Sequence, residues 1–177
     1  TFKITVEAIT VTSLSVDAAE AKTAYIGGED FIADGIVVVA TMNNGSTKTL
    51  TDDEYELTEP QLTTAGEHTV TVSYQGKTAT YKVSVKVITE IDYNGAELKV
   101  AIGETVNFEG EVDVVYSDET TGTLSVDSEF LNKKLPEFKM VLGRACNVRV
   151  ESKLDATVGV DIPVIIERFL QGESATI

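Results

Sequence analysis

Residues that could carry out catalysis are few in this sequence and are not grouped. His68 is the only histidine and Cys146 the only cysteine, so a Ser-His-Asp or Cys-His arrangement has one candidate base. His68 begins a strand-like run on the same parity as Val70 and Val72, which favours a structural role at the rim of a core. Zinc needs several His or Cys ligands. The sequence therefore predicts no catalytic residue, no cofactor-binding residue and no metal ligand, and the chain is not expected to be an enzyme.

Clustered carboxylates raise two other kinds of site. Calcium binds clustered hard oxygens, and the candidates are Asp52-Asp53-Glu54 beside Glu29-Asp30, and Asp118-Glu119. None of these has EF-hand spacing, so solvated loop charge is the favoured interpretation. The 29 acidic residues also leave open a carboxylate pair for glycoside hydrolysis, although abundance alone does not indicate one.

Aromatic side chains give little sign of a sugar-binding surface. Carbohydrate sites usually present exposed aromatic rings, but the chain has no Trp. Most of its Tyr and Phe side chains fall on the parity expected to face a core. Tyr93, in the turn Asp92-Tyr-Asn-Gly95, is the exception that could face solvent.

The stretch Thr63–Val87 predicts the β-hairpin that would carry His68. Apolar residues alternate with polar ones on both sides of Gln75-Gly76, which is the period-2 pattern of half-buried strands. A tight turn at this point requires residues that tolerate positive φ, and glycine does. The residues expected to face the core are His68, Val70, Val72 and Tyr74 on the first strand, and Ala79, Tyr81, Val83 and Val85 on the second.

The chain contains an internal repeat of about 80 residues. Thr1–Ile9 reads as a near-copy of Thr80–Ile88, 79 positions later, and Asp161–Phe169 keeps the same apolar positions after a further 81. The sequences that follow the first two copies also resemble each other. We therefore expect two tandem domains at residues 9–88 and 89–170, the second divergent, and a tail or linker at 171–177. Residues 1–8 then resemble the last strand of a preceding domain, or a donor strand.

Within the first repeat, the pattern predicts strands in an order typical of a sandwich. We expect a first strand at Ile9–Val16 that is interrupted by Asp17–Lys22 and resumes at Thr23–Ile26 after crossing from one sheet to the other. A further strand is expected to begin at Phe31–Ala33. The run Ile36–Met42 is apolar on both parities and predicts a central strand.

In the second repeat, Val112, Val114 and Tyr116 predict the central strand. Cys146 shares a parity with Val148 and Val150, so we expect it to pack as a small hydrophobe, and a single cysteine leaves both domains without a disulfide. Pro163 lacks an N–H donor, which predicts that the last strand lies at a sheet edge or is locally unpaired.

The strong negative charge excludes one class of partner. The chain carries 29 acidic and 14 basic residues, a formal net charge of −15. Nucleic-acid binding needs clustered Lys and Arg, and the longest basic run here is Lys133-Lys134. No apolar run is long enough to cross a bilayer, so membrane insertion is not expected.

Four segments together resemble the bacterial immunoglobulin-like (Big) domains. They are Tyr25–Glu29, Gly35–Leu50, Thr64–Tyr74 and Thr80–Val85. The resemblance covers residues 9–88 and extends to 89–169 through the internal repeat. It implies an all-β chain of two tandem immunoglobulin-like β-sandwich domains without disulfides. The family is found in tandem on bacterial surface proteins, adhesins, multidomain secreted glycosidases and some phage virion proteins, and membership supplies no catalytic residues.

Three functional hypotheses follow from this resemblance. The first is a non-catalytic structural or adhesion module of an extracellular bacterial surface protein, acting as a rigid spacer or binding array. The alternatives are a decoration, tail or fibre component of a phage virion or extracellular filament, and the accessory modules of a multidomain secreted glycosidase. The expected location is the bacterial cell surface or a virion surface. Neighbouring immunoglobulin-like modules and a protein or cell-surface glycan are the expected partners.

Overall fold

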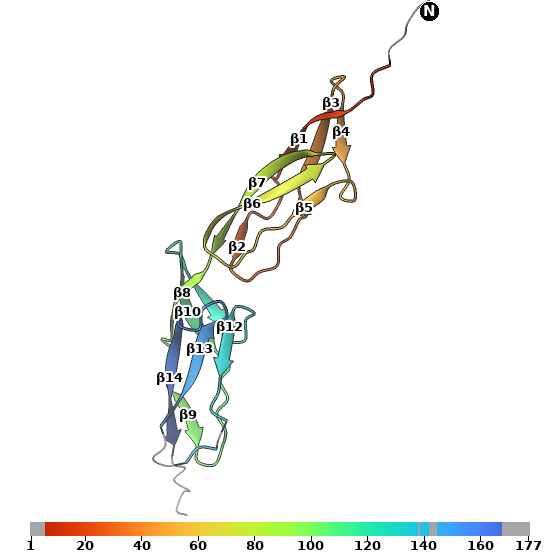
Figure 1. Cartoon of the computed structure of the whole chain (residues 1–177). Helices are drawn as coiled ribbons and strands as arrows, with labels where there is room; N and C mark the ends of the chain where they lie inside the picture. Colours follow the sequence, from red (N-terminus) through yellow and green to blue (C-terminus); the bar gives the residue numbers. More distant parts are fainter. Residues whose placement is uncertain (1–5, 138, 142–144, 168–177) are drawn as a thin grey trace, which may run out of the picture. The chain divides into compact units, whose positions relative to one another are not determined.

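The computed structural model describes residues 6–137, 139–141 and 145–167 (Figure 1). The chain divides into two compact units, Thr1–Lys86 and Val87–Ile177. Each is an all-β, immunoglobulin-like sandwich, and the described residues contain no helix, hence no helical segment that could cross a membrane. The predicted tail 171–177 and the first five residues of the predicted terminal strand 1–8 lie outside the described residues.

The first unit packs a three-stranded sheet against a four-stranded one. The first sheet has the order β1-β3-β4 and the second the order β2-β7-β6-β5. The strands are β1 (Val11–Asp17), β2 (Ala24–Ile26), β3 (Val37–Met42), β4 (Thr47–Leu50), β5 (Glu56–Thr58), β6 (Gly66–Tyr74) and β7 (Lys77–Lys86).

The second unit repeats this arrangement strand for strand. Its sheets have the orders β11-β10-β8 and β12-β13-β14-β9. The strands are β8 (Ile88–Asp92), β9 (Leu98–Ala101), β10 (Glu111–Tyr116), β11 (Thr121–Ser125), β12 (Leu131–Lys134), β13 (Cys146–Ser152) and β14 (Gly159–Glu167). The fold predicted for the divergent half is therefore confirmed.

The predicted broken first strand of the first unit is present. β1 pairs antiparallel with β3 in one sheet, and β2 pairs parallel with β7 in the other. The expectation of a strand at Phe31–Ala33 was wrong. There the Phe31 ring stacks on Tyr25 with centroids 6.0 Å apart, and the Tyr25 hydroxyl donates to the Ile32 carbonyl at 3.2 Å. Side-chain contacts to Tyr25 thus replace a backbone ladder.

The predicted hairpin is confirmed in register and in turn geometry. β6 and β7 pair from Gly66–Val85 to Tyr74–Lys77. Both turn residues have positive φ, 46° at Gln75 and 76° at Gly76, as in the two-residue turns that match strand twist.

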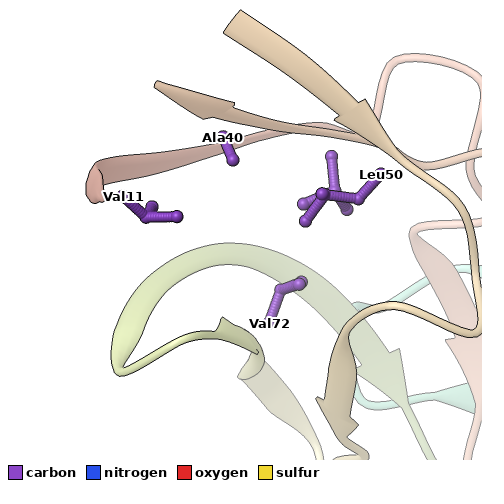
Figure 2. Close-up of a cluster of buried hydrophobic side chains, with 5 residues drawn as sticks. Val11, Ala40, Leu50 and Val72 are labelled. Carbon is purple, nitrogen blue, oxygen red and sulfur yellow. The ribbon is translucent and has the colours of Figure 1, made fainter. Parts of the chain in front are cut away.

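One core cluster of the first unit joins its two sheets (Figure 2). Val11, Ala40 and Leu50 come from the first sheet and face Val72 of β6. Val38, Ala40 and Val72 are 0 to 1% exposed, so their methyl groups are fully removed from water. Burying each of the two valines contributes about 1.5–3 kcal/mol, more than a single net hydrogen bond, so this cluster holds the sheets face to face.

Pro163 fits its strand for a local reason. β14 lies between β13 and β9, so the strand as a whole is not at an edge. However, β9 pairs with β14 only from Val164 onward, while Pro163 faces Asn147 of β13 on the other side. The half of β14 that contains Pro163 therefore tolerates its missing N–H, as the locally unpaired alternative predicted.

Gly35 should be much less tolerant of substitution than Gly45. Both have positive φ, +89° and +82°, but a Cβ at Gly35 would lie 2.5 Å from the Glu20 carbonyl oxygen, whereas nothing lies within 4 Å at Gly45. We expect Gly45→Ala to cost the left-handed strain alone, about 1 kcal/mol, and Gly35→Ala to cost about 3 kcal/mol because the backbone must also shift. Urea unfolding of the two variants measures this; equal losses would contradict it.

A buried carboxylate organises the outer face of the larger sheet in the second unit. The Glu151 side chain is only 6% exposed and lies 2.5 Å from Lys134 Nζ and 3.7 Å from Arg149 Nε. Arg149 also reaches Asp161 at 3.3 Å. In the first unit, Lys82 pairs with Glu67 at 2.6 Å, but both side chains there are mostly exposed.

Removing a lysine should therefore cost more in the second unit than in the first. Lys134 and Lys82 are themselves equally exposed, at 62% and 64%, so only their partners differ. We expect Lys134→Met to lower the free energy of unfolding of the second unit by about 2–3 kcal/mol, because Glu151 stays buried with a weaker partner. Lys82→Met should lower that of the first unit by less than about 1 kcal/mol. Chemical denaturation of each variant is the measurement, and similar costs would refute the role of burial.

Tyr55 should make stability sensitive to alkaline pH. Its hydroxyl donates to Asp52 at 2.9 Å. Burial and, to a smaller extent, this hydrogen bond raise the pKa of Tyr55 to about 12 from its ordinary value of 10.0. Because the unfolded chain loses this proton first, the stabilisation is complete below pH about 10 and declines toward pH 12. Tyr55→Phe should flatten the dependence of unfolding free energy on pH in this window. An unchanged slope would show that other groups cause it.

Candidate functional site

The two residues with catalytic potential lie in different units and have structural partners. His68 is half-buried at the start of β6, with Nε2 2.8 Å from the Thr64 carbonyl oxygen, as expected for a rim position. Cys146 begins β13 and is half-buried rather than fully buried; its Sγ lies 3.4 Å from Met140 Sδ. Within the described residues, the contact of His68 is with a backbone carbonyl and that of Cys146 is with a methionine sulfur, and both are contacts of structural positions.

Several of the carboxylates considered for calcium already have hydrogen-bond or ion-pair partners. In the loop before β5, Asp53 accepts a hydrogen bond from the Thr51 hydroxyl at 2.6 Å, which lowers the pKa of Asp53. Glu54 accepts from Lys48 and from the Thr51 N–H, and these bonds lower its pKa as well. Glu29 pairs with Lys22 at 3.0 Å. Among the described residues, no three or more His, Cys, Asp or Glu side chains gather in positions that could hold a metal ion.

Tyr93 contacts the protein through both its ring and its hydroxyl. Its ring packs edge-on against Phe108, with centroids 5.4 Å apart, and its hydroxyl donates to the Ala96 carbonyl at 2.6 Å. Both interactions turn the ring toward the protein. Tyr93 is half-buried, and its neighbour Asn94 lines a groove.

This groove, the polar groove hereafter, crosses the outward face of the sheet β11-β10-β8. Its volume is about 380 Å³, and the lining residues are Glu90, Asp92, Asn94, Asp113, Val114, Val115, Thr121, Gly122 and Thr123. Strand register creates it: Asp113 of β10 stands opposite Asp92 of β8 on one side and Thr123 of β11 on the other.

Asp113 lies at the centre of the polar groove and is held on both oxygens. Oδ1 accepts from the Thr123 hydroxyl at 3.2 Å, and Oδ2 accepts from Asn94 Nδ2 at 3.1 Å. Asn94 also donates to Asp92 at 3.3 Å. The groove therefore presents fixed hydrogen-bond acceptors and negative charge, which suits non-covalent contact with hydroxyl or amide groups.

Sequence reasoning missed the polar groove for an identifiable reason. The alternation Val112, Asp113, Val114 indicates that Asp113 points outward. Its neighbours, however, depend on the register of β8 and β11, which alternation within one strand does not determine. A second hollow of about 460 Å³ lies at the β6–β7 turn, lined by Glu54, Glu56, Ser73, Tyr74, Gln75 and Gly76.

Two enzymes share sequence with this chain. Pectate lyase L of Thermoclostridium stercorarium is 32% identical over 145 residues, which cover 76% of this chain and 12% of the relative. Exo-beta-1,6-galactobiohydrolase of Bifidobacterium longum subsp. longum is 38% identical over 94 residues, which cover 49% of this chain and 6% of the relative. The chain thus spans a small fraction of the length of either relative.

The family comparison agrees with the strand order. The sequence model described as bacterial Ig-like domain (group 3) matches residues 18–85, a range that runs from the end of β1 to the end of β7. This range includes the sheet-crossing segment, the central strand β3 and the whole β6–β7 hairpin, which are the features that carried the resemblance. The first unit of this chain is therefore a member of the bacterial immunoglobulin-like (Big) domain family.

Proposed function

We propose that this chain is a non-catalytic, immunoglobulin-like accessory region of a longer extracellular enzyme that acts on polysaccharide. The observation that carries the proposal is the small share of each relative's length that matches this chain. An alignment that covers 76% of this chain occupies 12% of a pectate lyase, and the galactobiohydrolase gives 6%. A segment that is so small a part of enzymes with different names is typical of an accessory region and not of a catalytic domain.

Within such an enzyme the chain would act as a spacer. Its units are closed sandwiches with apolar cores, and the formal net charge of −15 opposes self-association. Of the three hypotheses raised by the sequence, these relatives support the accessory-module one. The adhesion and virion hypotheses draw no support from them, since both relatives carry the names of enzymes.

Turnover and retention assays test this proposal on the full chain. With pectate and with β-1,6-linked galacto-oligosaccharides, we expect no product above the buffer rate. We also expect unchanged mobility in a native gel that contains pectate. Product formation that scales with protein concentration and disappears on heating would contradict a non-catalytic role.

A matched pair of variants distinguishes a spacer from a binding module. Retardation in the gel that Asp113→Ala abolishes and Glu111→Ala preserves would replace the spacer role by binding in the polar groove. Both residues are exposed carboxylates on β10, but only Asp113 lines that groove. A spacer predicts that the full chain and both variants migrate alike in gels with and without pectate.

A further inference from the structure

The second unit begins with a distinctive joint. Val87 is the single residue between Lys86, the end of β7, and Ile88, the start of β8. It exchanges two hydrogen bonds with Ser117, the first residue after β10. The Ser117 N–H donates to the Val87 carbonyl at 2.9 Å, and the Val87 N–H donates to Ser117 Oγ at 3.2 Å. Val87 is thus fixed at the point where one sandwich ends and the next begins.

The first unit begins with the same joint. Thr10 directly precedes β1, and Asn43 is the first residue after β3. The Asn43 N–H donates to the Thr10 carbonyl at 2.9 Å, and the Thr10 N–H donates to Asn43 Oδ1 at 3.2 Å. Asn43 Nδ2 adds a bond to the Ala8 carbonyl at 2.9 Å. Thr10 therefore occupies in the first unit the place that Val87 occupies in the second.

The residues before Thr10 have the sequence of a last strand. Thr1–Ile9 is the near-copy of Thr80–Ile88, and Phe2, Ile4 and Val6 alternate with polar residues as Tyr81, Val83 and Val85 do. These hydrogen bonds align Thr10 with Val87. This alignment is offset by two residues from the one that the sequence repeat gives. A shift of two keeps the same side chains on the same face. In the described part of this segment, Val6 is 87% and Ile9 65% exposed.

We propose that Thr1–Ile9 is the last strand of another immunoglobulin-like sandwich, which precedes the first unit in the parent polypeptide and is joined to it as the two units are joined here. A second copy of this chain does not fit as the partner, because its sandwiches already contain their own last strands, β7 and β14. The partner must lack that strand, and Phe2, Ile4 and Val6 would complete its core. The inference goes beyond the proposed function, since it does not depend on any enzyme.

A fusion provides the first test. Residues 11–79, a first sandwich without most of its last strand, are placed directly before Thr1 of the full chain, so that Thr1–Ile9 follow where Thr80–Ile88 normally would. We expect the amides of residues 2–8 to exchange with deuterium at least ~100-fold more slowly than in the unfused chain, because they join a sheet. Mass spectrometry of peptides from this segment measures the rate.

A reference fusion of equal length controls for the added copy. It carries Phe2→Tyr, Ile4→Val, Thr5→Ser, Glu7→Lys and Ala8→Val, which restore the sequence of Thr80–Ile88. Protection in the reference together with fast exchange in the test fusion would overturn the proposal.

A second measurement does not require the added copy to fold. In the full chain, Tyr81→Phe, Val83→Ile, Ser84→Thr, Lys86→Glu and Val87→Ala make β7 read as Thr1–Ile9. We expect the first unit to keep a cooperative unfolding transition and slow exchange along β6. Loss of the transition would overturn the proposal whatever the fusions show.

Light scattering separates a preceding module from a second copy as the partner. The unaltered chain should be monomeric at all concentrations, with or without residues 1–8. Assembly that deletion of residues 1–8 abolishes would show that the strand pairs with another copy, and would refute the proposal.

Discussion

The antiparallel pairing of β6 with β7 is the constraint on which the first sandwich depends. It places Val70 and Val72 of β6 on the same face of one sheet as Val83 and Val85 of β7, and all four are at most 5% exposed. Those valines are removed from water only if a second apolar face covers them, and Val38 and Ala40 of β3 provide that face. The second unit reproduces the arrangement with β13, β14 and β10. Once this hairpin is fixed, the remaining strands have few places to pair, because connections are short and edges must be occupied.

Much of this fold follows from local pattern. Period-2 alternation and Gln75-Gly76 were sufficient for the hairpin, and the repeat carried its topology into the divergent half. The strand expected at Phe31–Ala33 does not form, because a buried tyrosine hydroxyl bonds to the N–H and the carbonyl of Ile32 there. This is a tertiary contact, which the local pattern does not reveal. The carboxylates before β5 accept hydrogen bonds from Thr51 and Lys48, residues close to them in the sequence.

The polar groove could not be predicted from the sequence, for a different physical reason. It joins residues from three strands, and their proximity depends on how β8 and β11 are aligned against β10. Nothing in Asp92, Asp113 or Thr123 taken singly marks them as neighbours. A similar limit applied to Glu151, whose burial depends on Lys134 across the sheet and on Arg149 along its own strand. Alternation predicted which way these side chains point, but not what they meet.

The parallel pairing of β2 with β7 has a mechanical consequence. Because the first strand runs in the same direction as the last, the chain enters the first sandwich at one end and leaves at the other. Tension applied through the two chain ends then acts along β2 and β7 in opposite senses. The bonds between them, together with those from Gly27 N–H to the Lys86 carbonyl at 2.7 Å and from Ser84 N–H to the Thr23 carbonyl at 2.8 Å, are loaded in shear. They must break together rather than one by one, and the parallel pair β9–β14 gives the second unit the same resistance to pulling.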